Sequence, residues 1–392
     1  MENNTQLKEM IRSMVIDVLQ GQNQESASSQ PIKQAPRDQV EPGVFDTVDD
    51  AIQAAKAAQA RFEDCTLATR EKVIADIRAA MRPRVQELAQ KTVEETGMGR
   101  VADKVLKLNL TLDKTPGVED LVTECETGDN GMTLYELSAY GVIGAITPST
   151  NPAETLICNT IGMLAAGNAV FFSVHPGAKH LSRLLVSELN QIIAKSIGIE
   201  NLIVTLREPS IESAQEMMLH PDVSLLVVTG GPGVVKQALQ SGKKVIGAGA
   251  GNPPAFVDET ADIKKAARDI VLGASLDNNI LCIAEKSVVA MRQIEPQLVQ
   301  EMVKAGCVLI ENQQDIQRLV DLTVLPNGTP NKKFVGKNAS VILDAAHIPY
   351  NGDPRLIIMR TPKDHPFAVI EMLMPILPVV TVDSFDEGLD VC

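Results

Sequence analysis

The chain has 392 residues, of which 44% are hydrophobic and 22% charged, a composition typical of globular rather than disordered or fibrous proteins. This length exceeds what one small hydrophobic core usually contains, so we expect two domains or one large composite domain. The formal net charge of −14 leaves no basic stripe, which excludes nucleic acid as an expected partner and disfavours anionic membranes.

Residues 1–20 are predicted to form an amphipathic helix, because their apolar side chains recur at helical spacing. They carry charges throughout and lack the apolar core of a secretory signal. Residues 21–43 are rich in Gln, Ser and Pro and are expected to form a flexible linker. Such a tethered helix must bury its apolar stripe, and a partner protein is favoured over a bilayer because basic residues do not dominate its polar face. The alternative is docking on its own globule.

The first domain is predicted to span residues 44–258 and to bind a dinucleotide. Two long helical patterns run from residue 46 to about residue 96, and an extended hairpin is expected at about 126–142. Apolar strands, small-residue turns and helices then alternate, as in "GVIGAITPST" followed by "NPAETLICNTIGMLAAG". This alternation predicts an α/β fold with a doubly wound, mostly parallel sheet. No segment is apolar for the roughly 20 residues of a membrane span.

A second α/β domain is predicted for residues 259–392. Helices are expected at "DIKKAARDIVLGAS" and "IEPQLVQEMVKAG", and strands at "KSVVAM", "CVLI", "PRLIIMR" and "ILPVVTV". The chain stops at "SFDEGLDVC", which reads as the start of a helix. We therefore expect this domain to be incomplete at its C-terminus.

Two turns after predicted strands carry groups that could bind a ligand, because ligands of open α/β sheets lie beyond the carboxyl ends of the strands. In "VVTGGPGVV", Thr229, Gly230 and Gly231 precede a helix whose free N–H groups suit a pyrophosphate. In "ITPSTNP", hydroxyl and amide groups gather, among them Thr147, Thr150 and Asn151. The structural alternatives are a plain glycine-rich turn and a helix N-cap.

Cys282, in "GASLDNNILCIAEKS", is the candidate nucleophile. A cysteine between two apolar residues is more often buried and inert, but the polar triplet that precedes it favours a partly exposed thiol. The six cysteines include no CxxC pair, which excludes a zinc knuckle and a disulfide framework and fits a reducing cytoplasm. The five histidines show no metal spacing, so no metal site is expected.

Taken together, these turns resemble the aldehyde dehydrogenase superfamily, and specifically its CoA-acylating branch in bacterial microcompartments. The resemblance covers residue 44 to the end, with six motifs in the family's order: "TGDNGMTLYE", "TPSTNPAET", "VVTGGPGVV", "GAGAGNPP", "DNNILCIAEK" and "HPFAVIEMLMP". It implies an aldehyde dehydrogenase-like fold of two doubly wound α/β domains with a protruding hairpin, truncated at the C-terminus.

The resemblance also implies roles for single residues. Cys282 matches the nucleophile, and either Thr150 or Asn151, with Asn151 favoured, matches the oxyanion donor. Glu371 matches the glutamate that holds the nicotinamide ribose. The other expected cofactor contacts are Thr147, Pro148, His175, Pro176, Thr229, Gly230, Gly231 and Gly249. The implied cofactor is NAD, with NADP left open because Ser173 stands where many relatives carry a lysine.

Gly247 stands where hydrolytic relatives carry the glutamate that activates water. Without that base, thioester hydrolysis loses the roughly 10²–10⁴-fold that general base catalysis supplies. A free thiol, which is more acidic and more nucleophilic than water, can then take the acyl group. This argument agrees with the family's use of coenzyme A as co-substrate.

The implied activity is NAD-dependent oxidation of a short-chain aldehyde to acyl-CoA, and the reverse reduction, in the cytoplasm and inside a bacterial microcompartment. Residues 1–20 resemble encapsulation peptides, so a shell protein is the expected partner, and a homo-oligomer is expected. Two alternatives stay open: a truncated, non-catalytic protein of the microcompartment interior, and a hydrolytic aldehyde dehydrogenase.

Overall fold

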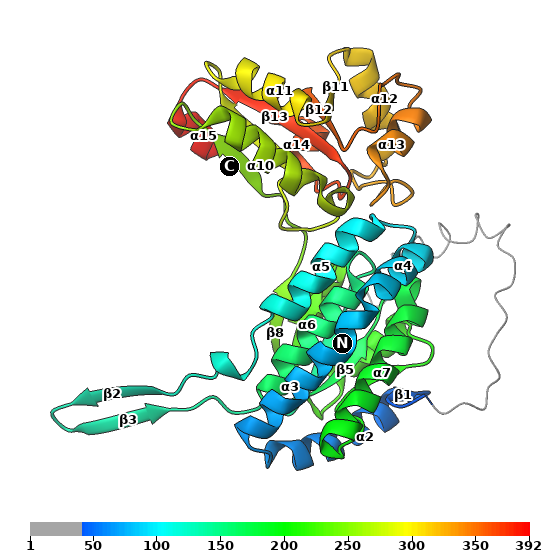
Figure 1. Cartoon of the computed structure of the whole chain (residues 1–392), viewed down its shortest axis with the longest axis vertical. Helices are drawn as coiled ribbons and strands as arrows, with labels where there is room; N and C mark the ends of the chain where they lie inside the picture. Colours follow the sequence, from blue (N-terminus) through cyan, green and yellow to red (C-terminus); the bar gives the residue numbers. More distant parts are fainter. Residues whose placement is uncertain (1–40) are drawn as a thin grey trace, which may run out of the picture. The chain divides into compact units, whose positions relative to one another are not determined.

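The computed structural model describes residues 41–392. The predicted N-terminal helix at 1–20 and the linker up to residue 40 lie outside the described residues. The described part contains two parallel sheets of six and five strands and a separate two-stranded hairpin (Figure 1).

Four helices follow the first strand, β1 (Val44–Phe45), where the sequence predicts two long helical patterns. They are α2 (Val48–Glu63), α3 (Leu67–Met81), α4 (Val85–Thr96) and α5 (Val101–Lys114). Thr47 and Thr66 cap α2 and α3 with their side-chain oxygens, and a short 3₁₀ turn containing Pro83 separates α3 from α4. The apolar pattern of the sequence does not predict α5, because part of the buried face of this helix consists of charged residues.

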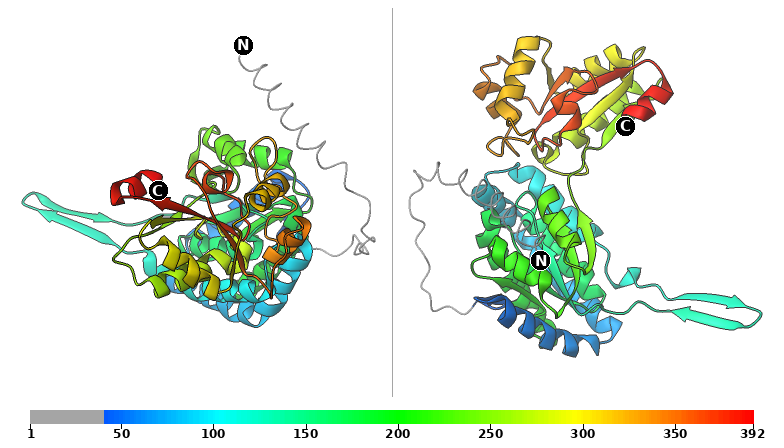
Figure 2. Two further views of the ribbon diagram at one scale, coloured as in Figure 1. Left: turned by 90° about the horizontal axis from the view of Figure 1, so that it is seen from above. Right: turned by 180° about the vertical axis from the view of Figure 1, so that it is seen from behind.

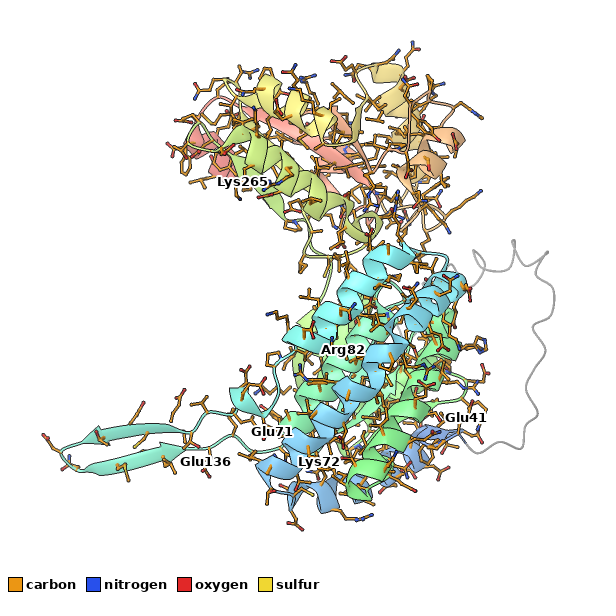
Figure 3. The ribbon with its side chains drawn as sticks, viewed as in Figure 1. Glu41, Glu71, Lys72, Arg82, Glu136 and Lys265 are labelled. Atoms are coloured by element: carbon orange, nitrogen blue, oxygen red, sulfur yellow. The ribbon has the colours of Figure 1, made fainter. Side chains whose placement is uncertain are left out.

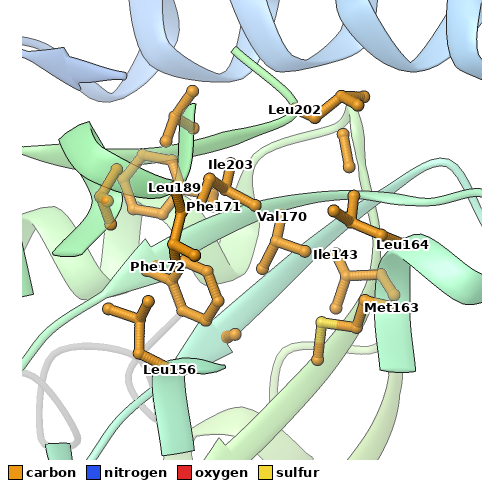
Figure 4. Packing of buried hydrophobic residues seen from close by; sticks show 14 of the residues in the cluster. Ile143, Leu156, Met163, Leu164, Val170, Phe171, Phe172, Leu189, Leu202 and Ile203 are labelled. Carbon is orange, nitrogen blue, oxygen red and sulfur yellow. The ribbon is translucent and has the colours of Figure 1, made fainter. Parts of the chain in front are cut away.

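The first sheet has the strand order β1-β6-β5-β4-β7-β8, and every pairing in it is parallel. Its strands are β1 (Val44–Phe45), β4 (Val142–Ile146), β5 (Ala169–Ser173), β6 (Ile203–Leu206), β7 (Val223–Thr229) and β8 (Lys244–Ala248), linked by α6 (Pro152–Ala165), α7 (Lys179–Ile197), α8 (Ile211–Leu219) and α9 (Pro232–Leu239). This is the doubly wound arrangement that the sequence predicts. Strands β4 and β5 are buried along their whole length, as expected for strands covered on both faces (Figure 4).

The predicted hairpin consists of β2 (Glu124–Gly128) and β3 (Gly131–Tyr135), which pair only with each other. Every residue of both strands is exposed. In two views the hairpin projects away from the helices and sheet that precede and follow it (Figure 2). A two-stranded hairpin on its own is at best marginally stable in water, so this arm needs a further surface to pack against.

The second sheet has the order β11-β12-β13-β10-β9 and is also parallel. Its strands are β9 (Pro254–Val257), β10 (Ser287–Met291), β11 (Cys307–Leu309), β12 (Leu356–Arg360) and β13 (Ile376–Val382), with helices α10 (Ile263–Ser275), α11 (Glu295–Lys304), α12 (Gln313–Thr323), α13 (Ala339–Ala345), α14 (Pro366–Val369) and α15 (Phe385–Val391). Strand β9 pairs with β10, so the border between the sheets falls before Pro254 rather than after residue 258.

Charged side chains cover the outer helices of the first domain (Figure 3). Lys72 pairs with Asp76 at 2.8 Å and Arg82 with Asp113 at 2.5 Å, and all four side chains are well exposed to solvent. Surface pairs of this kind contribute little to the free energy of unfolding, because water and salt screen them. Within residues 41–392, no helix is both long and apolar enough to cross a membrane.

Candidate active site

The turns expected to bind a dinucleotide follow four neighbouring strands of one sheet, β5, β4, β7 and β8. Because these strands are parallel, their carboxyl ends lie along the same edge. Eight predicted positions lie at those ends: Thr147 and Pro148 follow β4, His175 and Pro176 follow β5, Thr229 ends β7 and is followed by Gly230 and Gly231, and Gly249 follows β8. The fold therefore brings these eight predicted positions to one edge, whereas Glu371 comes from the second domain, between α14 and β13.

Two features of this edge fit a dinucleotide. Gly231 is the N-cap of α9, and a Cβ added there would meet no atom within 4 Å, so the helix N-terminus is open to a ligand. Such a terminus offers free N–H groups and a positive dipole end to a pyrophosphate. Thr147 is buried, and its Oγ1 has no hydrogen-bond partner within the described chain. An orphaned hydroxyl of this kind is available to a bound ligand.

The "TPSTNP" turn leads from β4 into α6. Asn151 is the N-cap residue of α6, but its side chain makes no capping bond to the helix. Its Oδ1 instead accepts a hydrogen bond from Lys107 Nζ, and its Nδ2 makes only a 3.3 Å contact with Thr150 Oγ1. The Asn151 side chain therefore does not cap α6, and one of its two Nδ2 N–H groups stays available as a donor.

Cys282 lies in a turn between a short 3₁₀ segment (Leu276–Asn279) and β10, and it is partly exposed. The next residue, Ile283, is 82% exposed, so the turn faces outward. Cys307 in β11 provides the contrast: it is buried, and burial raises the pKa of its thiol to about 12. A thiol with that pKa is inert at neutral pH, whereas the Cys282 turn leaves its thiol accessible.

The glycine-rich segment at 247–251 packs against the Cys282 turn at its far end. A Cβ added at Gly251 would lie 2.8 Å from the Cys282 carbonyl oxygen, so only glycine fits there without displacing the turn. A Cβ added at Gly247, in β8, would instead meet the Val235 side chain at 3.1 Å. Sequence reasoning singled out Gly247 and missed Gly251, because a close approach of two backbones leaves no mark in composition.

Lys286 holds the Cys282 turn from inside the protein. Its Nζ donates hydrogen bonds to the carbonyl oxygens of Asn279 at 2.9 Å and of Leu281 at 2.6 Å, and also to the Asn279 side chain. The residue is only 4% exposed. Burial lowers the pKa of its ammonium to about 8, and the nearby charges of Glu371, Cys282 and Glu285 act against that shift. A cation therefore stands beside the candidate nucleophile.

Glu371 closes the site from the second domain. Burial raises the pKa of its carboxyl group, while the Gly251 N–H and the Lys286 ammonium act in the opposite direction. Its Oε1 is buried and has no hydrogen-bond partner within residues 41–392. A free carboxylate oxygen is the acceptor that a ribose hydroxyl requires, so this residue fits the role expected for it.

Residues 41–392 contain no group of three or more His, Cys, Asp or Glu side chains suited to a metal ion. The functional groups described so far are the Cys282 thiol, the Asn151 amide, the Glu371 carboxylate and the buried Lys286 ammonium. Lys286 follows Cys282 closely in the sequence, so proximity to the candidate nucleophile is the signal that could have identified it.

A partly exposed cysteine beside a glycine-rich segment, in a fold whose first sheet presents a helix N-terminus suited to a pyrophosphate, is the arrangement expected of a thiol-dependent dehydrogenase. Residues 19–392 match the model of the aldehyde dehydrogenase family, so the chain belongs to this family.

Three proteins are similar to this chain, one by its sequence and two by both sequence and structure. The chain is 50% identical over 348 residues to the propanal dehydrogenase (CoA-propanoylating) of Salmonella typhimurium, with 88% of this chain and 75% of the relative covered. A Rhodopseudomonas palustris propionaldehyde dehydrogenase, solved with bound CoA and an acylated cysteine, is 48% identical with a TM-score of 0.87, covering 90% and 81% of the two chains. The propionaldehyde dehydrogenase of the Clostridium phytofermentans fucose utilisation bacterial microcompartment is 47% identical with a TM-score of 0.86, covering 90% and 80%.

The buried Lys286 predicts a pH dependence of stability. Its pKa of about 8 in the folded protein lies below the ordinary 10.5, so between these values the unfolded chain binds more protons and folding becomes more favourable as the pH rises. Relative to a Lys286→Met variant, the free energy of unfolding of the parent should rise by up to about 3 kcal/mol across this pH range. Urea denaturation at a series of pH values measures this change. Lys286→Arg, which does not titrate there, is the control. An equal pH slope in all three proteins would contradict the prediction.

Proposed function

We propose that this protein is a CoA-acylating aldehyde dehydrogenase, which oxidises a short-chain aldehyde to acyl-CoA with NAD through a thioester on Cys282, and catalyses the reverse reduction. The observation that carries the proposal is the partly exposed Cys282 turn, which packs against Gly251 at the end of the 247–251 segment, a segment that bears no carboxylate. Membership of the aldehyde dehydrogenase family and the relative with an acylated cysteine support it.

In the first half of the reaction, the Cys282 thiolate attacks the aldehyde carbon and forms a C–S bond. The resulting oxyanion accepts hydrogen bonds from the Cys282 backbone N–H and from Asn151 Nδ2, which stabilise the charge that develops there. Bound NAD⁺ supplies the hydride acceptor. Once hydride has left, the adduct is a thioester on Cys282, and Glu371 and the α9 N-terminus are the groups that would hold the nicotinamide cofactor.

In the second half, the thiolate of CoA attacks the thioester carbon, and the Cys282 thiolate leaves as the new C–S bond of acyl-CoA forms. Thiol exchange of this kind needs no activated water. Gly247 and the rest of the 247–251 segment offer no carboxylate to take a proton from water, so hydrolysis competes poorly. The hydrolytic alternative lacks the base it would require at this position.

Replacing the nucleophile tests the proposal. Cys282→Ala should lower NADH release from an aldehyde plus CoA by at least about 10³-fold, because the covalent step is lost. The matched control is Cys158→Ala, which removes an exposed cysteine of α6 and should retain the parent's rate. With CoA omitted, the parent should release at most one equivalent of NADH and little carboxylic acid. Unchanged acyl-CoA formation by Cys282→Ala would disprove the mechanism.

We further propose that the protein assembles as a homo-oligomer through the β2–β3 hairpin. Met132 is 70% exposed, Leu134 is 57% exposed and Tyr135 is 50% exposed, so the arm carries apolar side chains that the rest of residues 41–392 leaves uncovered. Burying such side chains contributes roughly 1.5–3 kcal/mol each. In this proposal, the exposed apolar side chains of the hairpin pack against a second copy of the chain.

Charge placed on the arm should dissociate the oligomer. Met132 and Leu134 lie on the same face of β3, because side chains alternate along a strand. A double Met132→Glu and Leu134→Glu variant should show a smaller mass than the parent in light scattering coupled to size exclusion. Asn130→Glu, at the hairpin turn, brings charge to the arm without touching that face and should keep the parent mass. Identical masses for all three proteins would argue against the hairpin interface.

We also propose that residues 1–20 dock the enzyme to a microcompartment shell protein. Support comes from their apolar spacing and from the relative of the Clostridium phytofermentans microcompartment. A fluorescent protein fused to residues 1–20 should co-purify with assembled shells, whereas a fusion carrying Ile11→Asp and Val15→Asp should not, because charge disrupts the apolar stripe. Equal capture of both fusions would count against this role.

A further inference from the structure

A buried carboxylate connects the two halves of the site. Asp277 is fully buried, and its Oδ2 accepts hydrogen bonds from Lys104 Nζ at 3.0 Å and from Lys107 Nζ at 2.5 Å. Its Oδ1 accepts from the Arg100 backbone N–H at 2.8 Å, and its own N–H donates to Asp103 Oδ2 at 3.0 Å. Asp277 belongs to the segment that leads to Cys282, whereas its partners belong to α5 and the residue before it.

The two lysines extend from Asp277 to the turn expected to stabilise the oxyanion. Lys104 Nζ donates to the Thr150 carbonyl oxygen at 3.2 Å, and Lys107 Nζ donates to Asn151 Oδ1. The lysines are three residues apart on α5, so they lie on one face of the helix. One carboxylate therefore positions two ammonium groups, and each ammonium holds one residue of the turn.

The contact with Lys107 determines which way the Asn151 amide points. A lysine ammonium has donors and no acceptor, so it can bond only to the amide oxygen. With Oδ1 held by Lys107, the NH₂ group must occupy the other side of the amide. One N–H of this group makes a long hydrogen bond of 3.3 Å to Thr150 Oγ1, and the other N–H is free to donate. Without Lys107, the two ends of the amide could exchange places.

Stability alone is a poor explanation for these buried charges. Lys104 is fully buried, the Lys107 side chain is 7% exposed, and Glu154 approaches Lys107 at 3.3 Å. Burying ions costs several kcal/mol each, and apolar replacements of buried ion pairs are often neutral or stabilising. Burial lowers the pKa of Lys104, with the Lys107 charge acting in the same direction, so the cluster carries an electrostatic cost. Fixing a geometry is the better reason to keep it.

We propose that Lys107, held in place by Asp277, is a positioning residue that orients the Asn151 amide with Nδ2 as the oxyanion donor. This deepens the proposed function and rests on it. Because Asp277 also belongs to the segment that leads to Cys282, the same carboxylate ties the donor to the element that carries the nucleophile. Lys107 itself touches neither substrate nor cofactor in this scheme and acts through Asn151.

The test is a double-mutant cycle in the full chain. Asn151→Ala removes the donor and should lower kcat for NADH release by about 10²–10³-fold. Lys107→Met should lower kcat by about 10–10²-fold with little change in KM for NAD, and iodoacetamide should still label Cys282 at the parent's rate. In the Asn151→Ala background, Lys107→Met should cause no further loss, since it acts only through that amide.

Lys104→Met is the matched control, because Lys104 shares the burial and the Asp277 contact but bonds the Thr150 backbone rather than the Asn151 amide. Its effect on kcat should persist in the Asn151→Ala background. Should Lys107→Met fail to fold, Lys107→Gln, which leaves Asp277 paired with Lys104, replaces it and should show the same non-additivity. Multiplicative losses from Lys107→Met and Asn151→Ala would overturn the inference. Activity retained by Cys282→Ala would instead overturn the proposed function, so the two failures are distinguishable.

Discussion

The buried carboxylate of Asp277 is the interaction on which the arrangement of the site depends. Lys104 and Lys107 both end on its Oδ2, and Asp277 is the one carboxylate paired with the buried Lys104 among the described residues, whereas Lys107 also approaches Glu154. An uncompensated charge in the interior costs several kcal/mol, so α5, the segment before Cys282 and the Thr150–Asn151 turn must come together as one unit. The segment that leads to Cys282 and the side chain of Asn151 therefore belong to a common charge network, although they come from different parts of the chain.

The backbone around this carboxylate is strained where the site requires it. Asp277, Asn278 and Asn279 all have left-handed φ angles, of 51°, 56° and 63°. Asp and Asn tolerate this region better than other side chains, but each such residue still costs about 1 kcal/mol. Asn278 adds hydrogen bonds to Gly336 and Asn338 of the second domain, at 2.8 and 2.9 Å. The polar triplet at 277–279 thus fixes the position of the segment that leads to Cys282.

The sequence predicted most of the fold, since strand and helix patterns with glycine-rich turns led to two parallel α/β sheets, which the structure confirms. Two differences have physical causes. Helix α5 was not predicted, because its buried face carries the charged residues Asp103, Lys104 and Lys107 and therefore lacks a continuous apolar pattern. Strand β9 was assigned to the first domain because chain order alone does not reveal that Pro254–Val257 pairs with β10.

Sequence by itself determined the local elements, the polar turns at the strand ends and the identity of Cys282 as the distinctive thiol, because these follow from periodicity and short motifs. Only the tertiary structure decided that Gly251 meets the Cys282 carbonyl, that Lys286 lies beneath the thiol turn, and which lysine holds the Asn151 amide. Those contacts join residues distant in the chain or depend on the direction of a buried side chain. Such choices are made by packing and charge pairing in three dimensions, which a linear pattern does not encode.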